Sequence, residues 1–240
     1  MQTDKNIRYR NELKFLCTNG MLDILEHRLR SVMVLDRYSL NGSYIVSSVY
    51  FDDYIDSCCL ENEMGIGERH KYRIRIYNDD DSYIKLEKKI KNNGKCRKRA
   101  SRLDHSAYNS LYTGDVMGVI QHTDQPLQRE FAIQIRTRRY TPKIIVRYER
   151  KAFVYPQGNV RITMDRNISA SLDTERFFSP GGACTYPVLE SGLHLLEVKY
   201  TDVLPYYIYQ AVQMNTLDRM TFSKYYIARK AARQYGGGRI

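Results

Sequence analysis

Charged and apolar side chains alternate along short stretches of this chain, as they do along β-strands. In residues 195–200, Glu197 and Lys199 share one face of a predicted strand, while leucine, valine and tyrosine occupy the other. Four further stretches repeat the pattern, and their charged faces hold Arg8, Arg10, Glu12 and Lys14; Arg73 and Arg75 with Tyr77; Lys85, Glu87 and Lys89; and Arg161 and Asp165 with Thr163. The chain therefore contains five predicted strands with one charged and one apolar face.

These alternating strands fit two kinds of sheet. A single strand of this kind is typical of an antiparallel sheet with one face in water. Five together favour a closed antiparallel barrel, whose charged faces line the bore and whose apolar outside is covered by helices or loops, an α+β architecture. Such a bore is mainly cationic, so its expected ligand is a polyanion. Glu12 and Glu197 are then candidate ligands for magnesium or manganese, which take carboxylate oxygens and bridge phosphate oxygens.

Helical periodicity and turn residues place the remaining elements. Helices are predicted over residues 18–33, with Thr18 as N-cap, and over 56–63, 103–120, 123–139, 204–217 and 225–235; further strands are predicted over 44–51 and 143–154. Turns are predicted at 78–82, 92–94 and 156–159, and a loop at 179–182. The turn at 156–159 makes a hairpin that is expected to bring Arg150 near Arg161.

The composition indicates a folded domain. Of 240 residues, 42% are hydrophobic, and no low-complexity or Pro/Gly/Ser-rich linker interrupts residues 1–230. We therefore expect a single domain over 1–240, ordered over about 7–230, with a flexible tail at 236–240. No signal-peptide pattern is present and no run approaches the ~18 apolar residues of a spanning helix, so a cytoplasmic location is expected.

Charge and residue usage narrow the classes of partner. The formal charge of +11 and the pI of about 9.4 indicate acidic partners: nucleic acid, an anionic membrane face or phosphorylated small molecules. A basic face also leaves open a membrane-embedded partner. The five cysteines lack CxxC spacing and are predicted to be reduced thiols. Most of the 21 tyrosines alternate into apolar rows, which disfavours base stacking, so no specific nucleic acid is expected.

Several common catalytic patterns are absent from the sequence. The five histidines have no ligand spacing, and there is no Walker GxxxxGK[ST], GxGxxG or GxSxG motif. A bound nucleotide would therefore be held through its phosphates. The basic run at 95–102 fits either a solvated sheet edge or part of the site. Its position directly after a cationic strand favours the site, with Arg97 as a phosphate-binding residue.

Seven short motifs occur in order: RNELK at 10–14, RIR at 73–75, EKK at 87–89, YERKAF at 148–153, VRI at 160–162, LEVK at 196–199 and FSK at 222–224. With this ordered set, the chain resembles the vacuolar transporter chaperone (VTC) domain family of the triphosphate tunnel metalloenzymes over about residues 7–230. The resemblance implies an eight-stranded antiparallel tunnel that binds a nucleotide triphosphate and, in the polymerase branch, makes inorganic polyphosphate from ATP. Arg10 departs from the pattern of the broader tunnel enzymes, which carry a glutamate there; fewer carboxylates favour one metal and phosphate transfer over water activation.

The resemblance also implies roles for individual residues by matching position. The residues that correspond to phosphate-binding positions are Lys14, Arg73, Arg75, Lys89, Arg150 and Arg161. Glu197 corresponds to the metal-binding carboxylate, and Lys199 and Lys224 to lysines close to the transferred phosphoryl group, so these three form the predicted catalytic set. Asp165 matches an acidic position without an assigned role. Each charged residue could instead form a structural ion pair.

Three functions follow from these expectations. The first is an ATP-dependent polyphosphate polymerase, a phosphotransferase that uses ATP, inorganic polyphosphate and manganese or magnesium. The second is a hydrolase of tripolyphosphate or nucleoside triphosphates with the same fold. The third is a non-catalytic module that binds polyphosphate, RNA or an anionic membrane face, which the net charge favours.

Overall fold

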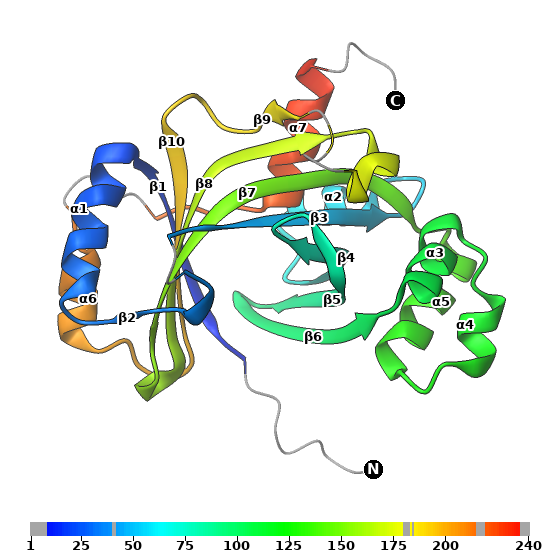
Figure 1. Cartoon of the computed structure of the whole chain (residues 1–240), viewed down its shortest axis with the longest axis horizontal. Coiled ribbons are helices and arrows are strands. Elements are labelled where there is room, and N and C mark those ends of the chain that lie inside the picture. The colour runs from blue at the N-terminus through cyan, green and yellow to red at the C-terminus, as the bar shows by residue number, and fades with distance from the viewer. Residues whose placement is uncertain (1–8, 40–41, 180–182, 184, 215–218, 236–240) are drawn as a thin grey trace.

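One antiparallel sheet wraps around a central space in a computed structural model of the chain, which describes residues 9–39, 42–179, 183, 185–214 and 219–235 (Figure 1). Eight strands follow one another in the order β1-β10-β8-β7-β3-β4-β5-β6. Their bounds are β1 Asn11–Thr18, β3 Tyr44–Asp52, β4 Glu68–Tyr77, β5 Asp80–Asn92, β6 Lys95–Leu103, β7 Thr141–Tyr155, β8 Val160–Ser171 and β10 Leu193–Tyr200. Two short strands, β2 (Val34–Leu35) and β9 (Tyr186–Pro187), pair with β7 and β8. The predicted eight-stranded antiparallel tunnel is confirmed.

The two ends of this strand order meet where β1 and β6 begin. Arg10 and Cys96 exchange two backbone hydrogen bonds of 2.9 and 3.0 Å. Farther along β1, the neighbour is the segment before α7: the Met220 N–H donates to the Lys14 carbonyl at 3.0 Å, and Phe15 forms a bridge with Arg219. Over the described residues, the seam between β1 and β6 is therefore only partly closed by strand pairing.

The pairing register turns the charged faces of the strands toward one another. Glu12 lies opposite Lys199 in the β1–β10 pair, and Arg73 lies opposite Glu87 in the β4–β5 pair. Directly paired residues of an antiparallel sheet point to the same face, so one face of the sheet collects the charges. The opposite, apolar face packs under the helices, as the alternation predicted.

Two helices cover the β10, β8 and β7 side of the sheet, α1 (Asn19–Arg30) and α6 (Tyr206–Val212) (Figure 1). Leu25 of α1 and Ile208 of α6 are fully buried in one cluster with Ile162 and Leu196 from the strands. Thr18 caps α1 as predicted, because its hydroxyl accepts the Met21 N–H at 3.4 Å.

Helices α2 (Ser57–Glu63), α3 (His105–Thr113), α4 (Met117–His122) and α5 (Pro126–Arg138) lie on the β3 to β6 side. Helix α7 (Lys224–Tyr235) packs against β7, β8 and α2. Short 3₁₀ turns lie at Arg37–Ser39, Gln157–Asn159 and Thr174–Phe178. In this core, Phe131 of α5 stacks on Tyr72 of β4, with ring centroids 4.4 Å apart. None of the described helices is long and apolar enough to span a membrane.

Two helix predictions need correction. The single helix expected over 103–120 is wrong, because Gly114 adopts a φ of +87° that ends α3 before α4 begins. The helix expected over 204–217 ends at Val212. Arg8, the loop residues 180–182, the end of that helix prediction at 215–218 and the tail 236–240 lie outside the described residues.

Candidate functional site

The charged faces of the strands line one cavity of about 850 Å³. Every predicted site residue lines it: Glu12, Lys14, Arg73, Arg75, Lys89, Arg97, Arg150, Arg161, Glu197, Lys199 and Lys224. Ten of these side chains come from seven strands, and Lys224 comes from the first turn of α7. The fold therefore gathers residues that lie more than 200 positions apart in the sequence around one space.

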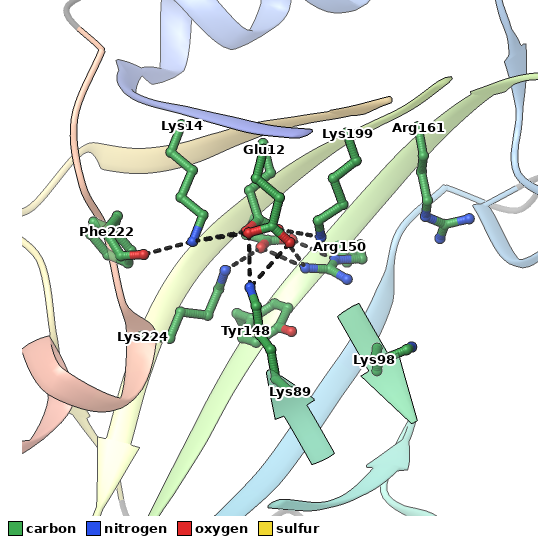
Figure 2. A network of polar contacts seen from close by, with 12 residues as sticks. Glu12, Lys14, Lys89, Lys98, Tyr148, Arg150, Arg161, Lys199, Phe222 and Lys224 are labelled. Atoms are coloured by element: carbon green, nitrogen blue, oxygen red, sulfur yellow. Dashed lines mark hydrogen bonds and ion pairs between the residues drawn. The ribbon is translucent and has the colours of Figure 1, made fainter. Parts of the chain in front are cut away.

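Two glutamates, Glu12 and Glu197, form the anionic centre of this cavity, and Figure 2 shows Glu12 among the surrounding lysines. Glu197 lies 2.7 Å from the Lys199 ammonium and 3.3 Å from that of Lys14. Glu12 accepts hydrogen bonds of 2.8 and 3.1 Å from Lys89, which reaches across from β5. Strands β1 and β10 pair so that Glu12 faces Lys199 and Lys14 faces Glu197, and this exchange of charges places the two carboxylates side by side.

Both carboxylates are held in the ionised form. Burial alone raises the pKa of Glu12, but Lys89 and Lys199 outweigh that effect and lower the pKa to about 2. Burial also opposes ionisation of Glu197, yet Lys199 and Lys224 hold the Glu197 pKa well below its usual range. Two negative charges therefore remain in the cavity at every physiological pH.

The donor set fits one hard divalent cation that shares its coordination with a phosphate. Among the described residues, no group of three or more His, Cys, Asp or Glu side chains could form an all-protein metal cage. Magnesium typically binds through one or two carboxylates together with water and phosphate oxygens. Glu12 and Glu197 supply two such carboxylates at adjacent positions of the sheet, so they are the residues that would hold the ion.

Asp165 organises the cations next to Glu197 and is fully buried. Its carboxylate accepts two hydrogen bonds from Arg150, at 2.6 and 2.7 Å, and lies 2.7 Å from the Lys224 ammonium. Both of its oxygens are therefore taken by cations. Asp165, to which the sequence analysis assigned no role, therefore orients Arg150 and holds the beginning of α7 against the sheet.

Arg150 and Arg161 were predicted to lie near each other, but in the structure they are not paired across the hairpin and each has a different partner. The β7–β8 register places Arg150 opposite Asp165 and Arg161 opposite Val154. Arg161 instead forms an ion pair with Asp36. The hairpin was predicted correctly, but its register could not be inferred from the turn alone, and each arginine has its own carboxylate partner.

Glu87 is a member of the site that the sequence prediction did not include. It is fully buried and lies 2.7 Å from Arg73, 3.5 Å from Arg75 and 2.8 Å from Lys98. Burial raises its pKa, but Arg73 and Arg75 hold that pKa well below the usual range. A permanently ionised carboxylate thus orients two arginines toward the cavity, and their remaining N–H donors can bind phosphate.

Tyrosine hydroxyls also orient the arginines. Tyr50 accepts a hydrogen bond of 2.9 Å from Arg73, and Tyr148 accepts one of 3.1 Å from Arg75. Tyr44 accepts one of 3.2 Å from Arg161. The expectation that the tyrosines lie in apolar rows is wrong for these three, which line the cavity. The parity of Tyr148 with Arg150 was the available signal, whereas β3 has no charged residue before Asp52 to mark the face of Tyr44 and Tyr50.

Three further lysines line the cavity and were not predicted: Lys71, Lys91 and Lys98. Lys71 precedes Arg73 by two positions on β4, so strand parity could have identified it. Lys98 pairs with Lys89 across β5 and β6, whereas Arg97 pairs with Ile90. Arg97 also lines the cavity, but Lys98 is the β6 residue on the Lys89 face.

Phosphate binding is expected to weaken as the pH rises through about 8. Burial lowers the pKa of Lys14 to about 8, and burial also lowers that of Lys98 to about 8 despite the nearby Glu87. Above this pH the free protein loses cavity charge, so its affinity for a polyanion falls. Calorimetric titration with tripolyphosphate between pH 7 and pH 9.5 tests this. A flat affinity over that range contradicts it, and in the variant Lys98→Met the pH dependence should be shallower.

The fold and the cavity define a tunnel-type protein with a phosphate-sized cationic interior. The family model described as "VTC domain" matches residues 9–233 of the chain. Because this match spans nearly the whole sequence, the chain belongs to the VTC domain family, as its motifs predicted.

Solved structures share the fold at low sequence identity. A Hippeastrum protein, classed as a candidate adenylyl cyclase and described with a dominant triphosphatase activity, aligns with a TM-score of 0.55 and 11% identity over 94% of this chain and 96% of its own. A candidate adenylate cyclase from Vibrio parahaemolyticus aligns with a TM-score of 0.50 and 12% identity, over 93% and 99%. At these identities the likeness shows the fold alone. No curated protein matches the chain.

Proposed function

We propose that this protein is an ATP-dependent polyphosphate polymerase, which transfers the terminal phosphoryl group of ATP to a growing chain of inorganic polyphosphate. One observation supports this function above the others: the cavity combines dense positive charge with carboxylates that are poor bases. The pKa of Glu12 is about 2 and that of Glu197 is well below its usual range. His70, which also lines the cavity, has a pKa lowered to about 4 by burial and by Lys88.

This lack of a base favours a nucleophile that is already anionic. Water must lose a proton when it attacks a phosphate, and a general base with a pKa near neutrality assists that step. A terminal phosphate oxygen of a polyphosphate chain carries its own negative charge. It attacks the γ-phosphorus of ATP, the bond from that phosphorus to the β,γ-bridging oxygen breaks, and ADP leaves with the electron pair. Such a transfer needs positioning and charge neutralisation more than proton transfer.

The cavity residues can supply both. Arg73, Arg75 and Arg150 are each fixed by a buried carboxylate and present guanidinium donors that suit phosphate oxygens. Lys199 and Lys224 flank Glu197 and are proposed to stabilise the charge on the transferred group. A magnesium or manganese ion held by Glu12 and Glu197 would neutralise phosphate oxygens and hold the ATP phosphates in line.

The direct test is incubation of the purified protein with ATP and manganese, followed by gel detection of polyphosphate and measurement of ADP. Chain growth matched by ADP release is the expected result. If neither chain growth nor loss of ATP is observed, both enzymatic functions are contradicted and only a binding module remains.

A second candidate is hydrolysis of tripolyphosphate or a nucleoside triphosphate. The triphosphatase activity described for the Hippeastrum protein, which has the same fold, favours this alternative. Release of orthophosphate without chain growth in the same assay would select it. Hydrolysis would then have to proceed without a carboxylate or histidine base among the described cavity residues.

A further inference from the structure

The cations of the cavity fall into two groups that differ in their partners. In the first group, which we call the central group, each cation has a carboxylate within ion-pair distance: Lys14, Lys89, Lys98, Lys199 and Lys224, with Arg73, Arg75, Arg150 and Arg161. Six others line the same cavity without a carboxylate partner among the described residues: Arg10, Arg69, Lys71, Lys91, Arg97 and Arg219. We call these six residues the seam cluster.

The seam cluster lies along the partly closed edge of the sheet. Arg10 directly precedes β1 and bridges to Cys96, and Arg97 follows Cys96 on β6. Arg69 and Lys91 are direct partners in the β4–β5 pair, near the hairpin between β5 and β6. Arg219 lies on the segment before α7, which takes the place of β6 as the neighbour of β1, and it forms a bridge with Phe15 of β1. The cations without carboxylate partners therefore lie along the seam, where strand pairing does not fully close the wall of the cavity.

Two members of the seam cluster show that its positive charges are not balanced by neighbouring anions. Lys71 donates to the neutral oxygens of Ser223, at 2.9 Å, and Asn62, at 3.2 Å. Burial lowers the pKa of Lys91, and the adjacent guanidinium of Arg69 lowers it further. Cations placed side by side without anions repel one another and destabilise the fold, so an anion that binds between them gains the energy of relieving that repulsion.

We propose that the seam cluster is a second anion site, which binds the part of an inorganic polyphosphate chain that extends beyond the central cavity. This inference deepens the proposed function, because it names where the chain lies while its end reacts. Residues of the central group would hold the triphosphate, and the seam cluster would hold the following phosphates. A triphosphate would occupy the central group alone and would not depend on the seam.

The chemistry of the seam favours polyphosphate over single-stranded nucleic acid. Binding of single-stranded RNA relies on aromatic side chains that stack on bases as well as on cations. The six members are all lysine or arginine, and the adjacent aromatic residues Phe222 and Tyr225 are buried. Tyr225 is further occupied, because it stacks on Tyr50 and donates a hydrogen bond of 2.6 Å to Asp52.

The test compares ligands of two lengths on the full chain, without nucleotide. Binding of tripolyphosphate and of long-chain polyphosphate is measured by calorimetry for the wild type and for Arg69→Gln/Lys91→Gln. The long chain is expected to lose about tenfold or more in affinity, since the variant removes charge-assisted hydrogen bonds to its phosphates. Tripolyphosphate affinity is expected to change by less than about twofold, because salt screens charges that the ligand does not contact.

A matched control removes two exposed cations outside the cavity, Arg136→Gln/Lys230→Gln. This variant has the same change in net charge and should bind both ligands as the wild type does. The slope of log affinity against log salt for the long chain should fall by about two in the seam variant, one for each lost phosphate contact, and stay unchanged in the control.

Three outcomes would overturn the inference. One is an equal loss of affinity for both chain lengths, and another is no loss for either. The third is that single-stranded RNA binds the wild type as tightly as polyphosphate and weakens in the same variant, which would indicate a nucleic-acid site. Because these measurements need no turnover, a failed polymerase assay leaves them valid, and a failed seam test leaves the polymerase assay valid.

Discussion

Glu197→Gln is expected to reduce metal-dependent turnover by about 100-fold to 1,000-fold, because a bound ion supplies several kcal/mol of charge stabilisation in the transition state. Glutamine keeps the shape of the side chain but removes the charge that would hold the ion. The affinity for ATP should change far less, since Lys14, Arg150 and Lys199 all keep their charges. Steady-state rates as a function of manganese concentration measure the effect, and a thermal melt monitors the fold.

Glu130→Gln is the matched control for this variant. Glu130 also belongs to an ion network, since it accepts hydrogen bonds from Tyr72 at 2.7 Å and from Lys88 at 2.5 Å and pairs with Arg99. It does not line the cavity, so its loss should leave turnover near the wild-type value. Full metal-dependent activity in Glu197→Gln would show that Glu197 is not the metal ligand.

Lys224→Ala is expected to lower kcat by about 100-fold, the usual effect of removing one preorganised donor from a developing charge, with little change in the KM for ATP. Asp165 keeps both of its hydrogen bonds to Arg150 in this variant, so its buried charge remains paired and the fold should survive. Lys224→Arg, which retains the charge and the pairing with Asp165, should recover part of the rate.

A binding residue should give the opposite pattern. In Arg75→Ala, Glu87 still has Arg73 and Lys98 as partners, so the fold should be retained while the affinity for ATP and for every polyphosphate decreases together. Comparison of kcat and KM between the two variants separates the roles. If Lys224→Ala changes only the apparent affinity for ATP, Lys224 is a further binding residue and has no special part in the transfer step.

Strand alternation in the sequence favoured a closed barrel with a charged bore and identified most of its lining, and the ordered motifs implied the eight-stranded tunnel. The side-chain period of a strand is two, so a run such as residues 73–77 defines which residues share a face without any knowledge of the neighbouring strand. Repetition of a charged face in several strands then implied a common interior, and ten of the eleven predicted site residues were found through strand patterns or motifs that lie on strands. The eleventh, Lys224, was found through the motif at the beginning of α7.

The partners of those residues could not be found in the same way. Asp165 and Lys224 are far apart in the sequence but lie 2.7 Å apart, and Glu12 reaches Lys89 across a seam that no hydrogen-bonded ladder spans in the described chain. Which carboxylate faces which cation depends on the register between strands, and a shift of one residue would turn every side chain to the other face. The register is set by packing of the whole sheet and its helices.

The sequence by itself thus determined that this protein has an antiparallel tunnel with a cationic interior and two candidate metal carboxylates, because that information is local to each strand. Only the tertiary structure decided which cations are neutralised and which are not. Glu87 and Asp165 became buried counterions, and three tyrosines became hydroxyl acceptors for arginines. The seam cluster has no carboxylate partner within the part of the chain that the structure describes. Those properties arise from cross-strand distances of a few ångströms, which long-range pairing alone sets.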